Sequence, residues 1–159
     1  MYRIGDKIVY PMHGAGVIEA IEEKEYLGSK QYYYVLKMPV GDLRVMIPTQ
    51  NVVEVGIREV IKPVEFEKVQ RILRDPSVNV TTNWNKRYRE NMIKIKSGSI
   101  YEVADVFRSL KLRENSKGLS TGERKMLNSA KQILLSELVL VIDKSQAEIE
   151  EEIENCIYD

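Results

Sequence analysis

The character of the chain changes near residue 55, and this change limits the folds that it can adopt. Before it, short segments rich in β-branched and aromatic residues alternate with turn formers such as Pro11, Gly28 and Gly41. After it, apolar residues recur at helical spacing. We therefore predict an α+β protein of two domains: a small, strongly bent antiparallel β barrel at residues 1–55 and a compact domain of about five helices at residues 56–159.

Five short strands are predicted in the first domain. The run Tyr32-Tyr33-Tyr34 lies in the third of them. Because neighbouring residues of a strand point to opposite faces, we expect core and edge packing for these rings, with an aromatic cage for a cationic side chain as the alternative. The predicted strands span residues 8–10, 16–21, 32–38, 43–47 and 52–55.

Serine–glutamate pairs mark three helix starts in the second domain. In each pair the serine hydroxyl can accept a helix N–H, and the carboxylate three residues later can accept the serine N–H. Gly98 and Gly118 stand where the preceding helices should end. The pairs are Ser99 with Glu102, Ser120 with Glu123, and Ser145 with Glu148.

Residues 82–96, TNWNKRYRENMIKIK, predict a basic helix that carries the only tryptophan of the chain, Trp84. Thr82 is the predicted N-cap, which places Trp84 in the first turn. An aromatic ring beside cations at a helix N-terminus suits contact with an opened or bent nucleic acid duplex. An apolar stripe of ordinary core type is the alternative, and its members are Trp84, Tyr88, Met92 and Ile95.

The net charge of zero is a cancellation between segments. Residues 54–125 hold sixteen basic and ten acidic residues, whereas residues 126–159 hold two basic and eight acidic ones. The positive middle segment indicates a local surface for an anionic partner, which the overall charge conceals.

Several function classes find no support in the sequence. Neither GxxxxGK[ST] nor GxGxxG occurs, and His13, the one histidine, has no second metal ligand near it. We therefore predict no catalytic residue, no cofactor and no metal, and we do not expect an enzyme. The chain has no apolar stretch of about 18 residues, so we predict no membrane-spanning helix. The single cysteine, Cys156, indicates a cytoplasmic protein.

Four short segments are distinctive. They are VYPMHGAGV at residues 9–17, GDLRVMIP at residues 41–48, TNWNKRY at residues 82–88 and GLSTGERKML at residues 118–127. In this order they resemble the CarD/CdnL family of bacterial RNA polymerase-binding transcription regulators. The first two segments also resemble the polymerase-interaction module of transcription-repair coupling factors.

The resemblance implies a Tudor-like barrel that binds the RNA polymerase β subunit by extending a sheet along its edge. It implies a helical domain that contacts promoter DNA at the upstream edge of the transcription bubble, with little base specificity, and association with the nucleoid through polymerase. Neither a membrane nor a small-molecule substrate is implied. An alternative is a polymerase-independent nucleic-acid binder or an adaptor with Trp84 in its core.

The resemblance also implies two sets of contact residues. The tryptophan at position 84 is expected to wedge into the minor groove. Some relatives carry arginine where this chain has Met46, so the salt bridge to polymerase that such an arginine makes is not expected here, and an apolar contact is the alternative. Lys24 keeps the charge that relatives carry at its position, without the fork of an arginine. The DNA-contacting set is Asn83, Trp84, Lys86, Arg87, Arg89, Arg124 and Lys125, and the polymerase-contacting set is Lys24, Glu25, Tyr26 and Met46.

Overall fold

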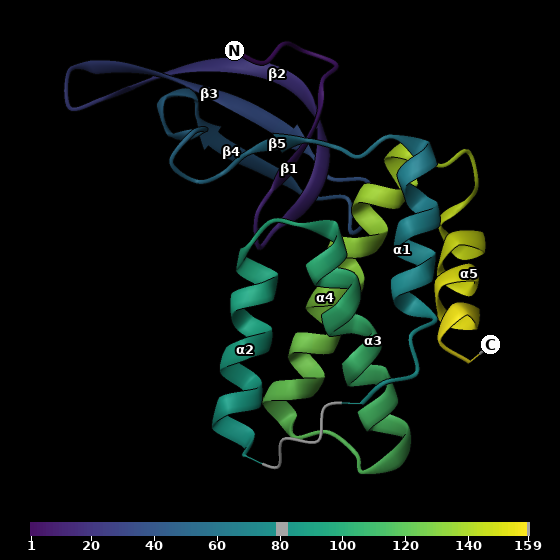
Figure 1. Cartoon of the computed structure of the whole chain (residues 1–159). Helices are drawn as coiled ribbons and strands as arrows, with labels where there is room; N and C mark the ends of the chain where they lie inside the picture. The colour runs from purple at the N-terminus through teal and green to yellow at the C-terminus, as the bar shows by residue number, and fades with distance from the viewer. Residues whose placement is uncertain (79–82, 159) are drawn as a thin grey trace.

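A computed structural model describes residues 1–78 and 83–158, with a β domain followed by a helical domain (Figure 1). The prediction of a two-domain α+β fold is confirmed. The strands are β1 (Lys7–Tyr10), β2 (Gly14–Tyr26), β3 (Ser29–Lys37), β4 (Arg44–Pro48) and β5 (Arg58–Glu59). After the short 3₁₀ turns η1 (Thr49–Asn51) and η2 (Pro63–Glu65) come the helices α1 (Phe66–Leu73), α2 (Trp84–Lys96), α3 (Ile100–Ser116), α4 (Thr121–Val141) and α5 (Gln146–Tyr158).

The five strands form one antiparallel sheet in the order β4-β3-β2-β1-β5. A register shift between Ile18 and Ala20 marks a bulge in the long strand β2. A bulge bends a strand and increases its twist, so β2 can pair with β1 along its first part and with β3 along most of its length. The sheet therefore curves around its own apolar core, which includes Ile8, Tyr34 and Leu36.

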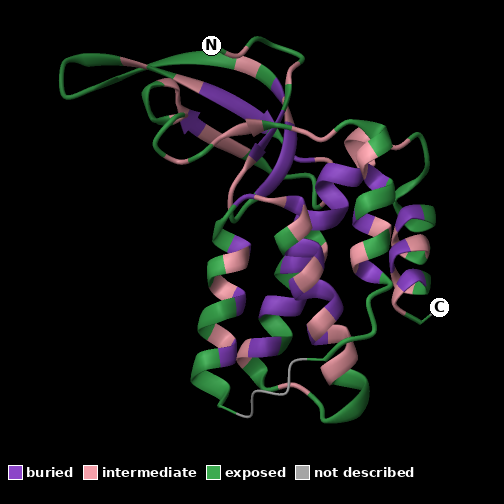
Figure 2. Cartoon of the chain, viewed as in Figure 1, coloured by how far each residue is buried: buried purple, intermediate pink, exposed green. Residues whose placement is uncertain are grey.

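The β2–β3 hairpin projects from the sheet as a two-stranded ribbon (Figure 1). Its turn consists of two residues, Leu27 and Gly28, both with positive φ, which matches the twist of the flanking strands. Every residue from 21 to 30 is exposed, and Figure 2 shows the outer ribbon as exposed. Along β3, Tyr34 enters the core while Tyr32, two residues farther out, is exposed.

The prediction of a strand at residues 52–55 is wrong. These residues form a turn in which the Val55 N–H donates to the Asn51 carbonyl and the Ile57 N–H donates to the Val52 carbonyl. Strand propensity reflects packing on a half-buried sheet, and Val53 is largely exposed. The fifth strand is instead β5, which pairs with β1 and lies beyond residue 55.

Helices α1, α3, α4 and α5 share one apolar core, whereas α2 lies at its side and contributes Ile95 as its one fully buried aliphatic residue among those described. The Ser120 and Ser145 capping boxes form in both directions. At Ser99 only the serine hydroxyl caps the helix, because the Ser99 N–H already donates to the Ser97 hydroxyl. Among the described residues, no helix is long and apolar enough to cross a membrane.

The last turns of α4 attach the helical domain to the sheet. The Ala15 N–H donates to Ser136 Oγ at 2.8 Å. Next to it, Glu137 accepts from both terminal nitrogens of Arg58 at 2.7 Å and from the Ile61 N–H at 2.8 Å. Buried polar groups need partners, so these bonds specify how the two domains meet.

Candidate nucleic-acid and polymerase interfaces

The N-terminus of α2 begins at Trp84, and Asn83 caps it by accepting the Lys86 N–H on its side-chain oxygen. Thr82, the predicted cap, lies outside the described residues. The N-terminus of α4 lies beside this point, because Trp84 Nε1 donates to Ser120 Oγ, the cap of α4, at 2.9 Å. Two helix N-termini, each with positive dipole character, are therefore adjacent at the candidate DNA site.

The Trp84 side chain is exposed yet held in place. Its residue is 41% exposed, and its ring stacks on Tyr88 with 5.0 Å between centroids and 20° between planes. A Cβ added at Gly122 would lie 3.6 Å from the Trp84 ring and 3.5 Å from the Tyr88 ring, which is ordinary van der Waals distance, so both rings pack against the start of α4. Stacking and the bond to Ser120 leave the rest of the indole open to solvent. With 41% of the residue exposed, Trp84 is not a fully buried core residue.

Arg87 does not belong to an exposed DNA-contacting surface. It is only 4% exposed, and its guanidinium binds the Glu123 carboxylate through Nε at 2.9 Å and Nη2 at 3.3 Å. At 100° per residue, the Arg87 side chain lies about 60° from Trp84 around the axis of α2. This is the side of α2 that packs against α4. A charge in that position has to be paired, and the paired Arg87 joins α2 to α4.

Glu123 is a shared acceptor behind Trp84. Besides Arg87, it accepts from the Ser120 N–H and hydroxyl, and Arg113 Nε lies 3.9 Å from its carboxylate. Burial on its own raises the pKa of this carboxyl group. The hydrogen bonds from Arg87 and Ser120 outweigh burial and hold the pKa of Glu123 below its ordinary value. Glu123 is therefore charged at neutral pH, and the sequence indicated only its capping role.

Four other predicted DNA-contacting cations are exposed. None of them forms an ion pair with another residue that the structure describes, so their charge is available to a partner. Two lie on α2, and two are the fourth and fifth residues of α4, close to the two adjacent N-termini. They are Lys86, Arg89, Arg124 and Lys125. Together with Asn83 and Trp84 they are the exposed members of the predicted DNA-contacting set, and we call this set the basic face. At 100° per residue, Lys86 and Arg89 project from the side of α2 away from Trp84, whereas Trp84 faces α4.

The predicted polymerase-contacting residues lie on the other domain. Lys24, Glu25 and Tyr26 are exposed at the end of β2, next to the hairpin turn. Met46 lies in β4, closer to the body of the sheet, so the four residues do not form one tight cluster. The strand register assigns Lys24, Tyr26 and Met46 to one face of the sheet and Glu25 to the opposite face.

Strand β4 is an edge of the sheet. It pairs with β3, and among the described strands nothing pairs with its other side. An unpaired edge can accept a strand from another protein. Met46 stands at the middle of this strand and is partly buried. The free edge of β4 can therefore accept the sheet extension that the family resemblance implies.

The described residues offer little for metal or redox chemistry. No group of three or more His, Cys, Asp and Glu among them is arranged to hold a metal ion. Cys156 is buried on α5. His13 is exposed in a turn, with its ring 4.3 Å from that of Tyr10. None of these residues joins the basic face.

Comparison with known proteins gives two family matches. The model for the CarD-like/TRCF RID domain matches residues 2–61, and the model for the CarD C-terminal domain matches residues 68–154. A putative transcription factor, YdeB of Bacillus subtilis, is 44% identical over 141 residues, which cover 89% of this chain and 92% of that protein. The solution NMR structure of the 72-residue N-terminal domain of Myxococcus xanthus CarD is 30% identical, covers 37% of this chain and 79% of that chain, and has a TM-score of 0.33.

Proposed function

Because the chain belongs to the CarD family of transcription regulators, we propose that it stabilises open promoter complexes. In this proposal the β domain binds the RNA polymerase β subunit, and the helical domain contacts promoter DNA at the upstream edge of the bubble. Residues 1–55 together with β5 are the polymerase-binding part, and the helices are the DNA-contacting part. The protein is then associated with the nucleoid through polymerase.

The observation that carries this proposal is that the Trp84 ring is exposed and also held in one orientation. A large ring that is exposed but oriented by Tyr88 and Ser120 loses little conformational entropy when it packs against a base. An inserted aromatic or apolar side chain needs an unstacked base step, and such steps occur where a duplex opens. Trp84 therefore suits the fork between paired and unpaired DNA.

Exposed cations near the start of α2 and α4 support contact with the phosphate backbone. Lys86 and Arg89 on α2, with Arg124 and Lys125 on α4, lie around two helix N-termini, which also favour phosphate. Such contacts position a protein on DNA without reading bases, and the minor groove itself carries a degenerate pattern. Low sequence specificity follows from this arrangement.

Polymerase binding raises the local concentration of the basic face at the promoter, so weak DNA affinity is sufficient. One aromatic–base contact contributes about 1–3 kcal/mol. Since each 1.4 kcal/mol changes an equilibrium tenfold, the contact would shift promoter opening by roughly 5- to 150-fold. This is sufficient to regulate initiation, and it is insufficient to melt a duplex without polymerase.

The test is the lifetime of the open complex with cognate polymerase, measured for wild type, Trp84→Ala and Tyr158→Ala. Tyr158 is the control because it is an exposed aromatic on α5, across the helical domain from α2 (Figure 1). We expect the wild type and Tyr158→Ala to extend the lifetime and Trp84→Ala to lose most of the effect. Thermal melts of the three proteins verify folding. Equal activity of a folded Trp84→Ala variant would refute the wedge.

Polymerase binding is tested with two charge reversals on one ribbon. Lys24→Glu changes the face that includes Met46, whereas Lys30→Glu changes the opposite face at nearly the same distance from the turn. We expect Lys24→Glu to weaken capture of polymerase and Lys30→Glu to leave it nearly unchanged, while both retain the wild-type melt. Equal retention of polymerase by both variants would remove Lys24 from the proposed interface.

A further inference from the structure

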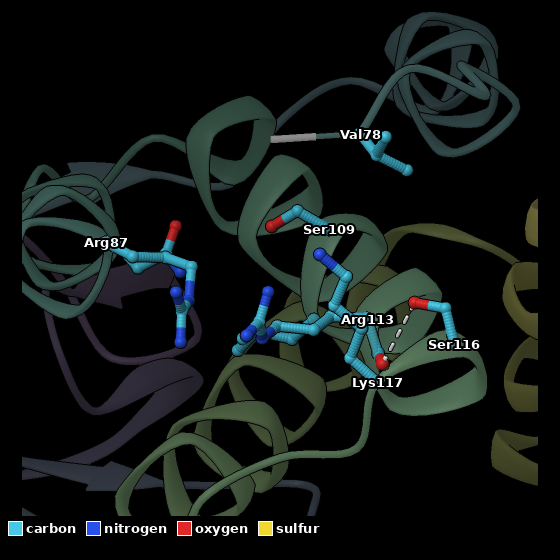
Figure 3. Close-up of a pocket in the computed structure, with 8 residues that line it drawn as sticks. Val78, Arg87, Ser109, Arg113, Ser116 and Lys117 are labelled. Atoms are coloured by element: carbon cyan, nitrogen blue, oxygen red, sulfur yellow. Dashed lines mark hydrogen bonds between the residues drawn. The ribbon is translucent and has the colours of Figure 1, made fainter. Parts of the chain in front are cut away.

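A cavity of about 340 Å³ lies between α2 and the C-terminal half of α3. Of the described residues that line it, three are basic and none is acidic. Figure 3 shows Arg87 on one side of this space and Arg113, Ser116 and Lys117 on the other. The basic residues are Arg87, Arg113 and Lys117. Even after the charge of Glu123 is counted, positive charge is in excess here.

Several donors at this cavity have no hydrogen-bond partner among the described residues. Asn91 is only 7% exposed, and its amide forms no hydrogen bond with a described residue. The buried Nε of Arg113 has no hydrogen-bond partner in the described chain, since Glu123 is 3.9 Å away. Lys117 is exposed and forms no ion pair with the residues described. Buried polar groups without partners are rare in folded proteins, and a bound ligand is one way to satisfy them.

The serine hydroxyls of the cavity are already committed. Ser109 donates to the Val106 carbonyl, and Ser116 donates to carbonyl oxygens of the preceding turn of α3. Arg87 is held by Glu123. The groups that remain for a ligand are therefore two cations and one amide, all of which can donate to an anion.

We propose that this cavity binds a small phosphorylated anion, held by Arg113, Lys117 and Asn91. A guanidinium matches the geometry of phosphoryl oxygens, and an ammonium adds charge without a fixed direction. The volume is at the lower end of the range for small-molecule sites, about 300–1,000 Å³. Val78 and Leu110 add aliphatic surface beside the donors, which suits the carbon skeleton of a phosphorylated metabolite.

The cavity is connected to Trp84 through hydrogen bonds. Trp84 Nε1 donates to Ser120 Oγ, and the Ser120 hydroxyl donates to the Glu123 carboxylate. Glu123 in turn attracts Arg113 across 3.9 Å. An anion that draws Arg113 toward itself changes the surroundings of Glu123, so the fluorescence of the single tryptophan should respond. This inference does not depend on the DNA contact proposed above.

The experiment titrates the full chain with inorganic pyrophosphate, followed by calorimetry and by the NMR signal of the Asn91 side-chain amide. We expect binding, with a dissociation constant at least about 10-fold higher in Arg113→Met and in Lys117→Ala, because each removes a charged donor. Lys96→Ala is the matched control and should bind as wild type does. Lys117 is the C-cap of α3 and Lys96 the last residue of α2, so both remove a cation at a helix C-terminus.

Three outcomes would overturn the proposal. They are no binding of pyrophosphate together with an unmoved Asn91 signal, equal loss of binding in all three variants, and binding that occurs only with a short DNA duplex. The last would assign the phosphate to nucleic acid. Lys117→Ala keeps the test decisive if Arg113→Met fails to fold, because Lys117 is an exposed residue without a described ion pair.

Discussion

Among single residues, Glu123 has the most demanding environment at the basic face. Its residue is almost fully buried, and it accepts hydrogen bonds from Ser120 and from the equally buried Arg87. Removing one member of a buried ion pair leaves the other charge without compensation. Arg87 therefore depends on Glu123, and the orientation of Trp84 depends on Ser120, which Glu123 holds by the capping box.

Glu123→Gln should lower the free energy of unfolding by about 3–5 kcal/mol, because it breaks the buried ion pair between Glu123 and Arg87. The measurement is urea denaturation followed by circular dichroism. Glu151→Gln, an exposed glutamate on α5, is the control and should change stability by less than about 0.5 kcal/mol. A cost below about 1 kcal/mol at Glu123 would show that the buried pair contributes little.

Among the elements, α2 is the one held least by apolar packing. Two ion pairs in the described structure join it to its neighbours, Arg87 with Glu123 of α4 and Lys94 with Asp105 of α3, in addition to the Trp84–Ser120 hydrogen bond and the packing of Ile95. Burial raises the pKa of the Asp105 carboxyl group, but hydrogen bonds from Lys94 and Arg108 outweigh it, and the pKa is lowered overall. The position of the basic face therefore depends on two ionised carboxylates.

Acidification should release α2 before it unfolds the rest. Both carboxyl groups have lowered pKa values in the folded state, so their stabilising contribution is present above the ordinary values of 4.5 for Glu123 and 3.8 for Asp105. That contribution is lost as the pH falls through the lower folded values. Trp84 emission followed from neutral to acidic pH should change first, ahead of the far-ultraviolet dichroism of the whole chain. Coincident changes at every pH would contradict this order.

The contact of β2 with α4 depends on the absence of a side chain at Gly14. Gly14 has φ of +110°, and a Cβ there would lie 2.6 Å from Ser136 Oγ. Gly14→Ala should cost about 2 kcal/mol or more, from backbone strain and from the clash. Gly5 has φ of +95° with no atom within 4 Å of its would-be Cβ, so Gly5→Ala measures strain alone. Equal thermal shifts for the two variants would show that the clash is relieved cheaply.

In the whole molecule, the two domains meet through buried polar contacts of α4. The Arg58–Glu137 pair and the Ala15–Ser136 bond lie on consecutive residues of that helix. Neither domain can satisfy these groups alone, so the two domains should unfold together. A rigid connection between the ribbon and the basic face also fits a protein proposed to bind polymerase and DNA at the same time.

Glu137→Gln should separate the unfolding of the two domains. The substitution removes the counter-charge of Arg58 and weakens the acceptor of the Ile61 N–H, at a cost of about 2 kcal/mol. Hydrogen exchange by mass spectrometry should give equal protection for the β3 and α4 cores in wild type and lower protection for β3 in the variant. Glu150→Gln, in a partly exposed pair with Lys131 far from the sheet, is the control. Unequal protection already in wild type would argue against joint unfolding.

The sequence alone determined the order of the elements, the starts of the later helices and the position of Trp84 at the start of a basic helix. These features depend on residues within about four positions of one another, as in the capping boxes and the helix-ending glycines. Tertiary structure decided the rest. The sequence predicted Arg87 as an exposed cation, whereas in the structure it is bound by Glu123, 36 positions away. The fifth strand forms where it can pair with the edge of β1, and the valines at positions 52, 53 and 55 lie in a turn. The cavity beside Arg113 likewise exists only because two helices pack side by side. Local sequence patterns do not determine the distance between residues that are remote in the chain.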